Sequence, residues 1–468
     1  MNDLPLHALR AELERLREQV AERDRLIAQQ QQAIHDLQQR LAAAERSAKR
    51  QAAPFSPGPP SPNPRRPGRQ RGRRHGRHGH RPPPEPPQVD ETLEAPLPER
   101  CPDCGGHLTP THVDRQFQTE IPRRPWVRQL NIHCGHCQHC GKHCRGRHPV
   151  QTSDATGAAA SQLGPDAQAA VVYLNKHAGL SYGKIADVYG RLFGIRLTRG
   201  ACAQVVRRGG RRLQPAYEQL RDQLRAAKHL TPDETGWRVG GHTVWLHAWV
   251  GDDGSTCFAI DPQRGAAVLA GVIGWDWSGT LTHDGCPSYD RFAEATHQQC
   301  VDHALRRARA LVEKQAGAAK IFPRQVIDLF QGALRARDQF LEGQLGAAGL
   351  EQAHTRYVSQ LLDLSGRPRR NEANQTFANH LYNHGEQWLM FLCDPSIPAT
   401  NHRAEQALKV PIVNRKVWGG NRTEAGAEAQ EVTSSVLQTC KNKALDAFAY
   451  ISSAFRGVLG TLNPAPAK

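Results

Sequence analysis

Three acidic residues stand out because each lies in a setting that could hold a metal ion. Asp233 and Asp284 each end a short strand-like run that gives way to Thr or Gly, and Glu405 lies in a stretch with helical character. We expect both aspartates at the edge of a sheet, open to solvent. Two such acids and a third from a helix could hold two Mg²⁺ or Mn²⁺ ions roughly 4 Å apart, as phosphodiester chemistry requires. We predict that Asp233 bridges both ions, Asp284 holds one and Glu405 holds the other.

Acids in this part of the chain also have structural interpretations. An Asp near a turn is more often a backbone cap than a metal ligand. Glu405 could form an ion pair with Lys409 on an exposed helix, worth about 0.3–0.5 kcal/mol. Asp252 and Asp253 lie in a Gly-flanked turn, and we interpret them as turn formers. Glu234 should point to the opposite face from the preceding aspartate if the strand continues.

The elements around the acids follow the order of an RNase H-like core. After the strand with Asp233, a hairpin is expected from strands at 243–250 and 256–260, then a helix and a strand that leads to Asp284. A further short strand is expected at 298–301.

About 100 mostly helical residues then precede Glu405, which is too long for a loop. We therefore predict a catalytic domain at 229–440 with a helical insertion at about 305–398. A C-terminal helix and tail follow at 441–468. The whole chain is predicted to be a multidomain α+β protein.

The segment 4–50 repeats with a period of seven, which predicts a coiled coil and a homo-oligomer. The alternative is a single amphipathic helix packed on its own domain. Apolar residues fill one heptad position without a break, and the partner position is interrupted by Arg23 and Gln30. The two sets are Leu6, Leu13, Val20, Ile27, Ile34 and Leu41, and Leu9, Leu16 and Leu37.

The segment 51–98 is rich in Pro, Gly, Arg and His and is predicted to be a disordered linker. Its basic run from Arg65 to Arg81 could contact phosphates or act only as a solubilising spacer. The net charge of +16, from 61 Lys and Arg against 45 Asp and Glu, favours a polyanionic partner. A solvated basic surface is the alternative.

No run of about 18 apolar residues occurs, and the N-terminus is polar, so we expect no membrane span and no secretory signal. The expected location is cytoplasmic, associated with the nucleoid. Cysteines in that compartment are more often thiols or metal ligands than disulfides.

The segment 99–150 is predicted to be a zinc-binding domain. Two Cys-x-x-Cys-Gly turns would supply a tetrahedral structural zinc site, which we interpret as a zinc ribbon. The predicted ligands are Cys101, Cys104, Cys137 and Cys140, with Cys134 as an alternative partner for Cys137 that lacks the trailing Gly. Free thiols are the other interpretation.

The segment 154–228 is predicted to be helical and to bind DNA. A helix, a Gly-containing turn and a second helix with four arginines are compatible with a helix-turn-helix. A helical bundle that bridges two domains is the alternative, with the arginines on a solvated face. These are Arg207, Arg208, Arg211 and Arg212.

Several short stretches of the chain resemble transposases of the insertion-sequence-66 family. The likeness covers nearly the whole chain in the same order, from the heptad segment to the C-terminal tail. It is carried by Pro232-Asp-Glu-Thr-Gly-Trp237, His283-Asp-Gly285 with Tyr289-Asp290, Cys300-Val-Asp-His303, Asn401-His-Arg-Ala-Glu405 and Asn414-Arg-Lys-Val-Trp418.

The resemblance implies that Asp233, Asp284 and Glu405 form an Asp-Asp-Glu triad, and it favours Glu405 over Glu386 or Glu424 as the third acid. The family often has Asn where this chain has His402 and Arg near Lys409. A Cys-x-x-His element that often follows the second acid matches Cys300 and His303. These two residues either support the site and contact phosphate or pack where a strand meets a helix.

The resemblance also implies an activity: Mg²⁺-dependent DNA strand cleavage and strand transfer at the ends of an insertion sequence. Double-stranded DNA, as terminal inverted repeats and as target, would be the partner, with small accessory proteins of the same element. Basic residues near the third acid are expected to contact phosphates, namely Arg403, Lys409, Arg415 and Lys416. The alternatives are a non-catalytic DNA-binding regulator and an RNase H-like nuclease without strand transfer.

Overall fold

The computed structural model describes residues 6–49, 85, 89–96, 98–107, 109–111, 113–117, 125–151, 153–155 and 162–463. The chain divides into two compact units, Met1–Thr119 and Glu120–Lys468. Most of the predicted linker, with its basic run, lies outside the described residues. Among the helices that are described, none combines the length and the apolar character needed to cross a membrane.

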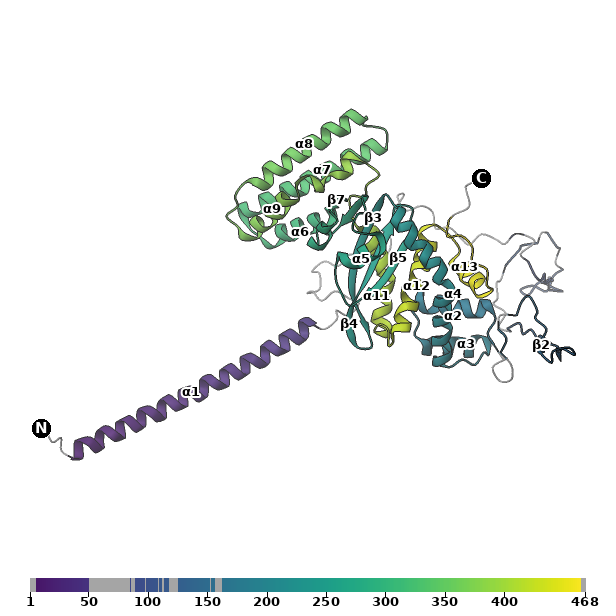
Figure 1. Cartoon of the computed structure of the whole chain (residues 1–468), viewed down its shortest axis with the longest axis horizontal. Coiled ribbons are helices and arrows are strands. Elements are labelled where there is room, and N and C mark those ends of the chain that lie inside the picture. Colours follow the sequence, from purple (N-terminus) through teal and green to yellow (C-terminus); the bar gives the residue numbers. More distant parts are fainter. Residues whose placement is uncertain are drawn as a thin grey trace. The chain divides into compact units, whose positions relative to one another are not determined.

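The first unit contains one long helix, α1 (Leu6–Lys49), which Arg23 and Gln30 do not interrupt (Figure 1). Its apolar stripe is not covered. Half or more of each side chain is exposed for Leu13, Leu16, Val20, Ile27, Ile34 and Leu37. Within the first unit these side chains are thus available for contact with another helix.

The second unit is a mixed α/β structure built on a five-stranded sheet. The strand order is β5-β4-β3-β6-β7, with β3, β4 and β5 antiparallel and β3, β6 and β7 parallel. The strands are β3 (His229–Val239), β4 (His242–Gly251), β5 (Thr256–Asp261), β6 (Thr280–His283) and β7 (Thr296–Gln299). A separate hairpin pairs β1 (Cys134–His136) with β2 (His143–Arg145).

Two strands differ from the sequence prediction. Asp233 does not end its strand, because β3 pairs with β4 as far as Val239 and buries Trp237 on the way. The last strand lies two residues earlier than expected, because Cys300 already caps the helix that follows β7. The predicted hairpin is confirmed as β4 and β5.

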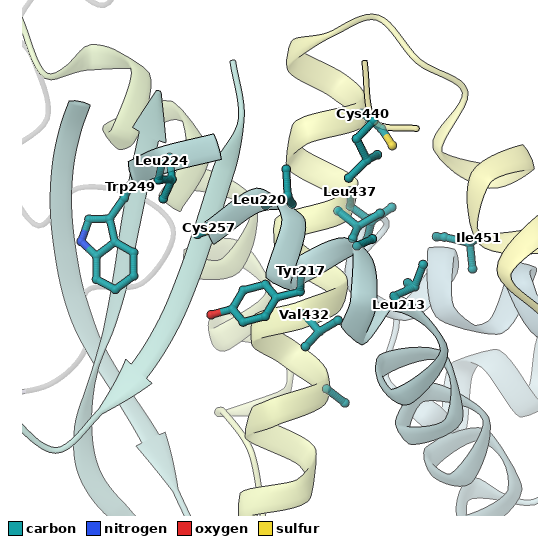
Figure 2. Close-up of a cluster of buried hydrophobic side chains, with 14 of the residues drawn as sticks. Leu213, Tyr217, Leu220, Leu224, Trp249, Cys257, Val432, Leu437, Cys440 and Ile451 are labelled. Carbon is teal, nitrogen blue, oxygen red and sulfur yellow. The ribbon is translucent and has the colours of Figure 1, made fainter. Parts of the chain in front are cut away.

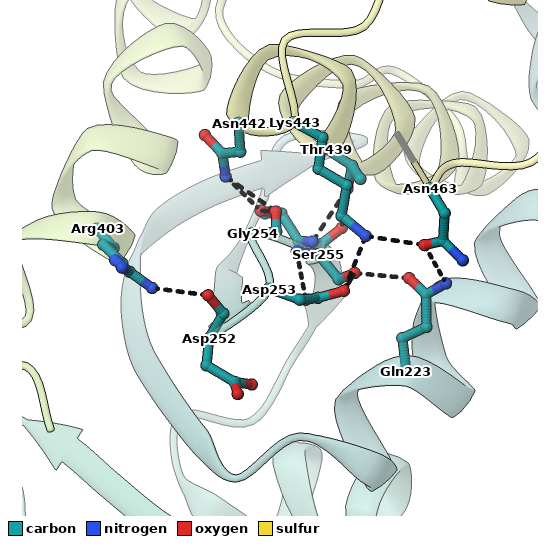
Figure 3. A network of polar contacts seen from close by, with 11 residues as sticks. Gln223, Asp252, Asp253, Gly254, Ser255, Arg403, Thr439, Asn442, Lys443 and Asn463 are labelled. Carbon is teal, nitrogen blue, oxygen red and sulfur yellow. Dashed lines mark hydrogen bonds and ion pairs between the residues drawn. The ribbon is translucent and has the colours of Figure 1, made fainter. Parts of the chain in front are cut away.

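The turn of that hairpin is held by polar contacts, as the Gly-flanked pair of aspartates predicted (Figure 3). Asp253 accepts hydrogen bonds from the Ser255 N–H at 2.8 Å and from the Lys443 ammonium at 2.8 Å. The Asp252 carbonyl accepts a 3.2 Å bond from Arg403. Asp253 is therefore confirmed as a turn former.

The helices before the sheet are α2 (Pro165–Lys176), α3 (Tyr182–Phe193) and α4 (Arg199–Ala226). The predicted helix, turn and helix are present: Gly194 closes α3 in the left-handed region, and the Thr198 side chain caps α4 by accepting from the Ala201 N–H at 3.0 Å. α4 continues through Pro215, so its arginines lie in mid-helix rather than near the end as expected.

α4 is a central element of the core (Figure 2). Its Leu220 and Leu224 are fully buried beside Cys257 of β5 and Val432 of α12 (Glu424–Asn442). A Cβ at Gly210 would come within 2.8 Å of Ala429, so α4 and α12 pack too closely for a larger residue. The packing matches a helix that joins the helical region to the sheet. α5 (Ala266–Ile273) and α13 (Ala447–Phe455) complete this core.

The helices of the predicted insertion form a lobe with its own core (Figure 1). They are α6 (Val301–Lys314), η5 (Gly317–Lys320), α7 (Ile321–Leu341), α8 (Ala347–Gly366), α9 (Glu372–His384), η6 (Gly385–Trp388) and α10 (Met390–Cys393). Gln298 of β7 ties this lobe to the sheet. Its amide donates to the Trp388 carbonyl at 3.1 Å and accepts from the Phe391 N–H at 2.9 Å.

The outer strand β5 is capped by a polar ladder on α12. Three alternate N–H groups of the strand donate to side chains spaced four residues apart on the helix. Thr256 donates to Thr439 at 3.0 Å, Phe258 to Ser435 at 2.9 Å and Ile260 to Glu431 at 2.6 Å. The match works because two strand residues and four helix residues both advance by about 6–7 Å.

Candidate active site

Asp233 and Asp284 lie at the same level of two neighbouring parallel strands. β3 and β6 pair with His229 opposite Thr280 and Leu230 opposite Leu281. Asp284 is as far from Thr280 along the chain as Asp233 is from His229. The same register therefore brings the two aspartates side by side, with Asp284 just beyond the end of β6. Residues at equal positions in neighbouring strands also point to the same face of the sheet.

That face is covered by α11 (His402–Trp418), the helix that carries Glu405. Trp237, which shares the face of Asp233, packs in one cluster with Ala404 and Leu408 of α11. Asn414 fixes the far half of the helix, because its amide donates to the Lys176 carbonyl at 2.7 Å. A side chain at Gly179 would overlap the Asn414 carbonyl oxygen, so this contact needs the glycine.

A buried joint between two helix starts positions the near half of α11. Cys300 precedes α6 and Asn401 precedes α11, and both are almost fully buried. The Cys300 thiol donates to Asn401 Oδ1 at 3.1 Å, and the Asn401 N–H donates to Cys300 Sγ at 3.4 Å. Cys300 thus packs where β7 meets α6, one of the two roles predicted for it. The joint holds His303 and Glu405 next to each other.

The three acids share one electrostatic environment. Burial raises the pKa of Asp233 to about 7, and the charges of Glu234, Asp284 and Glu405 add to the rise, although the Glu234 N–H donates to its carboxylate at 2.9 Å. Asp233 is half-buried in mid-strand, so it is only partly open to solvent. A cation bound here would favour the ionised form that burial disfavours.

Glu405 is engaged by a residue that the sequence did not single out. Arg306 of α6 places Nη2 2.7 Å from Glu405 Oε1, and its Nε lies 3.1 Å from Asp302. The predicted alternative, an ion pair of Glu405 with Lys409, is replaced by this contact. His303 Nε2 lies 3.9 Å from Glu405 Oε1. Burial and the Arg306 charge lower the pKa of His303, while the charges of Asp284 and Glu405 oppose the shift.

The spacing of the triad exceeds that of ligands on one ion. Among the described residues, only two groups of His, Cys and acidic side chains bring all their ligand atoms within 4.8 Å, and neither is the triad. A single ion held by all three acids would need closer oxygens.

Glu234 faces the opposite side of the sheet, as the alternation of the strand predicted. Its nearly buried carboxylate pairs with Arg264 at 2.8 Å and accepts a 3.2 Å hydrogen bond from the Tyr289 hydroxyl. Glu234 therefore supports the rear of the sheet. It does not face α11.

The four predicted phosphate-contacting residues lie along α11 at different depths. Lys409 and Lys416 are exposed, and so is Arg403 beside the β4–β5 turn (Figure 3). Arg415 is half-buried; its Nη1 donates to the hydroxyl of Thr235, two residues along β3 from Asp233, at 3.4 Å. Burial lowers the pKa of Arg415.

The first Cys-x-x-Cys-Gly segment forms a tight turn in the first unit. The Cys101 N–H donates to Gly106 at 2.9 Å, and Gly105 adopts φ +71. N–H groups of Cys104 and Asp103 point at the Cys101 sulfur and lower the pKa of its thiol. A lower pKa favours the thiolate, the form that binds zinc.

The second segment repeats this turn between β1 and β2. The Cys137 N–H donates to Lys142 at 2.8 Å, Gly141 adopts φ +72, and N–H groups of Cys140 and His139 lower the pKa of Cys137. The turn therefore uses Cys137 with Cys140. Cys134 lies on β1, where its thiol contacts the Ile132 carbonyl at 3.7 Å.

Residues 160–429 match the family model described as Transposase IS66 family, which covers more than half of the chain and includes all three acids. The chain belongs to the IS66 transposase family. No curated protein matches it. The transposase is thus by family a nucleic-acid-processing enzyme whose class uses a divalent metal and binds DNA.

Two residues of this transposase could not have been found from local spacing. Arg306 comes from α6, the first helix of the lobe, and contacts Glu405 of α11, which follows the lobe in the chain. Asn401 belongs to a stretch that carried the family resemblance, but its role as a buried partner of Cys300 becomes visible only in three dimensions. An Asn directly before a helical stretch that carries an acid is the sequence signal that could have drawn attention to this position.

Proposed function

We propose that this transposase cleaves DNA strands at the ends of an insertion sequence and joins them to target DNA, using Asp233, Asp284 and Glu405. The observation that carries the proposal is the shared register of β3 and β6, which sets two aspartates side by side beneath a helix with a glutamate. The charges of the other two acids both raise the pKa of Asp233, which supports their proximity.

An RNase H-like core is part of the proposal. An antiparallel trio β3, β4 and β5 continued by parallel β6 and β7 is the topology expected of that fold, with the acids on the central strand and its parallel neighbour. The catalytic domain would span 229–440, with α6 to α10 as the helical insertion and α13 within the C-terminal segment 441–468.

The donor set fits Mg²⁺ or Mn²⁺, because carboxylate oxygens suit these hard ions. Bound ions would activate the attacking hydroxyl and stabilise the leaving oxygen. Asp233, Asp284 and Glu405 would hold these ions. His303, whose pKa responds to the charges of Asp284 and Glu405, would contact a phosphate near these two acids, and Arg415 would contact the DNA backbone further along β3. Arg306, which contacts Glu405 Oε1, would compete with an ion for that oxygen.

The remaining segments would assemble the complex on DNA. The exposed apolar stripe of α1 supports a homo-oligomeric coiled coil over 4–50, and the paired cysteine turns support a zinc ribbon over 99–150. The linker 51–98 and the helical region 154–228 would add contacts to terminal repeats and target. The transposase would act in the cytoplasm, associated with the nucleoid, together with small accessory proteins of the same element.

The experiment uses DNA that carries the sequences flanking the gene on both sides, where the ends of the element would lie. Asp233→Asn, Asp284→Asn and Glu405→Gln should each lower Mg²⁺-dependent cleavage by at least about 100-fold, or ~2.7 kcal/mol in the barrier, with DNA binding retained. Asp252→Asn, an exposed acid on the neighbouring turn, is the control and should cleave normally. Full cleavage by a triad variant would remove that residue from the site.

The products of the same assay separate the alternatives. Strand-transfer products require a transposase, whereas cleavage without joining would indicate an RNase H-like nuclease. Binding without any cleavage by the unaltered chain would indicate a non-catalytic regulator.

A further inference from the structure

A group of three metal-binding residue types lies in the helical lobe, outside the triad. His354 comes from α8, Glu386 from η6 and Cys393 from the last position of α10. The three offer a nitrogen, an oxygen and a sulfur, and all three ligand atoms lie within 4.8 Å of one another. Such a mixed donor set suits Zn²⁺.

The three ligand atoms lie close together, but the His354 nitrogen forms no hydrogen bond with the other two. His354 Nε2 lies 3.5 Å from Glu386 Oε1, yet this buried nitrogen has no hydrogen-bond partner among the described residues. A buried ring nitrogen without a partner is costly, because it has lost its water and gained no bond. An ion held by all three side chains would satisfy it.

The second group with close ligand atoms gives a useful contrast. In that group His283 Nδ1 accepts from the Gly285 N–H at 3.2 Å, so its Nε2 carries the proton and donates to His297 Nδ1 at 3.1 Å. His297 Nε2 then donates to the Phe292 carbonyl at 3.1 Å. Every ring nitrogen is used, and no lone pair remains for an ion. We therefore interpret His283 and His297 as a hydrogen-bonded pair.

We propose that His354, Glu386 and Cys393 form a structural zinc site, with water or another ligand in the fourth position. The Cys393 thiol would lose its proton on binding and coordinate as thiolate. The site would fasten α8 to the η6–α10 segment, which Gln298 already ties to β7. The ion would thus stabilise the attachment of the lobe to the sheet.

The test counts zinc in the purified full-length chain after gel filtration. Cys393→Ser and His354→Ala should each lower the bound zinc by about one ion per chain relative to the unaltered protein. Asp363→Asn changes an exposed acid of α8 outside the site and is the control that should retain all zinc. Cys393 is itself exposed, so its substitution should leave folding intact.

Zinc at the cysteine turns is distinguished by Cys137→Ser, which should remove that ion and leave the lobe site loaded. Loading the protein with Co²⁺ gives a second measurement through the thiolate–Co²⁺ charge-transfer band. In the Cys137→Ser variant this band should come from the lobe site, and it should weaken when Cys393→Ser is added. Unchanged zinc content and an unchanged band in the Cys393 and His354 variants would overturn the proposal. The proposal would also be overturned if Cys137→Ser were the only one of these variants to lose zinc.

Discussion

Arg306 Nη2 lies 2.7 Å from Oε1 of Glu405, so a guanidinium already neutralises the third acid of the triad. The same side chain reaches Asp302, which holds it on α6. If Glu405 holds a divalent cation as proposed, Arg306 and that cation would compete for its carboxylate.

Replacing Arg306 should therefore strengthen metal binding. Arg306→Gln is expected to lower the half-saturating Mn²⁺ concentration about two- to fivefold, because a half-exposed ion pair contributes roughly 0.2–1 kcal/mol. Calorimetric titration measures the change. Arg309→Gln, an exposed neighbour on α6, should bind like the unaltered chain. An unchanged or weaker affinity in Arg306→Gln would show that the arginine does not compete.

The raised pKa of Asp233 makes stability depend on pH. The folded protein keeps the proton up to about pH 7, whereas an ordinary Asp loses it near 3.8. The free energy of unfolding should thus fall as pH rises from about 4 to 7, by at most about 1.4 kcal/mol per pH unit for one such group. Asp233→Asn should flatten this slope in urea denaturation without added Mg²⁺.

Glu431 should also make the free energy of unfolding fall as pH rises, because burial raises its pKa to about 7. Glu431→Gln keeps an acceptor for Ile260 and should remove the other part of the pH dependence. Added Mg²⁺ should restore stability near pH 8 in the unaltered chain and not in Asp233→Asn. Equal slopes in all three proteins would contradict the assignment.

The ladder between α12 and β5 should be visible in stability. Ser435→Ala leaves the buried Phe258 N–H without its acceptor and should cost about 1–3 kcal/mol of unfolding free energy. Ser278→Ala, at an exposed serine, should change stability by less than about 0.5 kcal/mol. Denaturation midpoints compare the two, and equal midpoints would mean that the N–H finds another partner.

Self-association should depend on the apolar stripe of α1. Ile27→Asp together with Ile34→Asp places charges in the heptad seam and should convert an oligomer to a monomer in sedimentation at micromolar concentration. Gln31→Glu, at a polar position, should leave the oligomer intact. A monomeric unaltered chain would refute the predicted coiled coil.

The strands that carry the acids could be predicted because each depends on a local pattern. Alternation and a turn predicted the hairpin of β4 and β5, and the short runs before Asp233 and Asp284 indicated strands. The burial of Asp233 could not be predicted, because it follows from β3 continuing to Val239 under α11.

Contacts across long insertions were beyond the sequence. Arg306 contacts Glu405 only because the chain, after the helices that follow α6, places the start of α11 beside the start of α6. The role of α4 was likewise open, since its arginines fit both a DNA-reading helix and a solvated face. Its tight packing on Ala429 shows that one side of the helix belongs to the core.

The side chains of α12 also decide how copies of this protein can meet. A strand at the rim of a sheet normally offers free N–H groups to another chain, which invites edge-to-edge growth. Thr439, Ser435 and Glu431 occupy those groups on β5, so a neighbouring molecule finds no open donors there. Two copies of the protein are thereby kept from joining their sheets through β5.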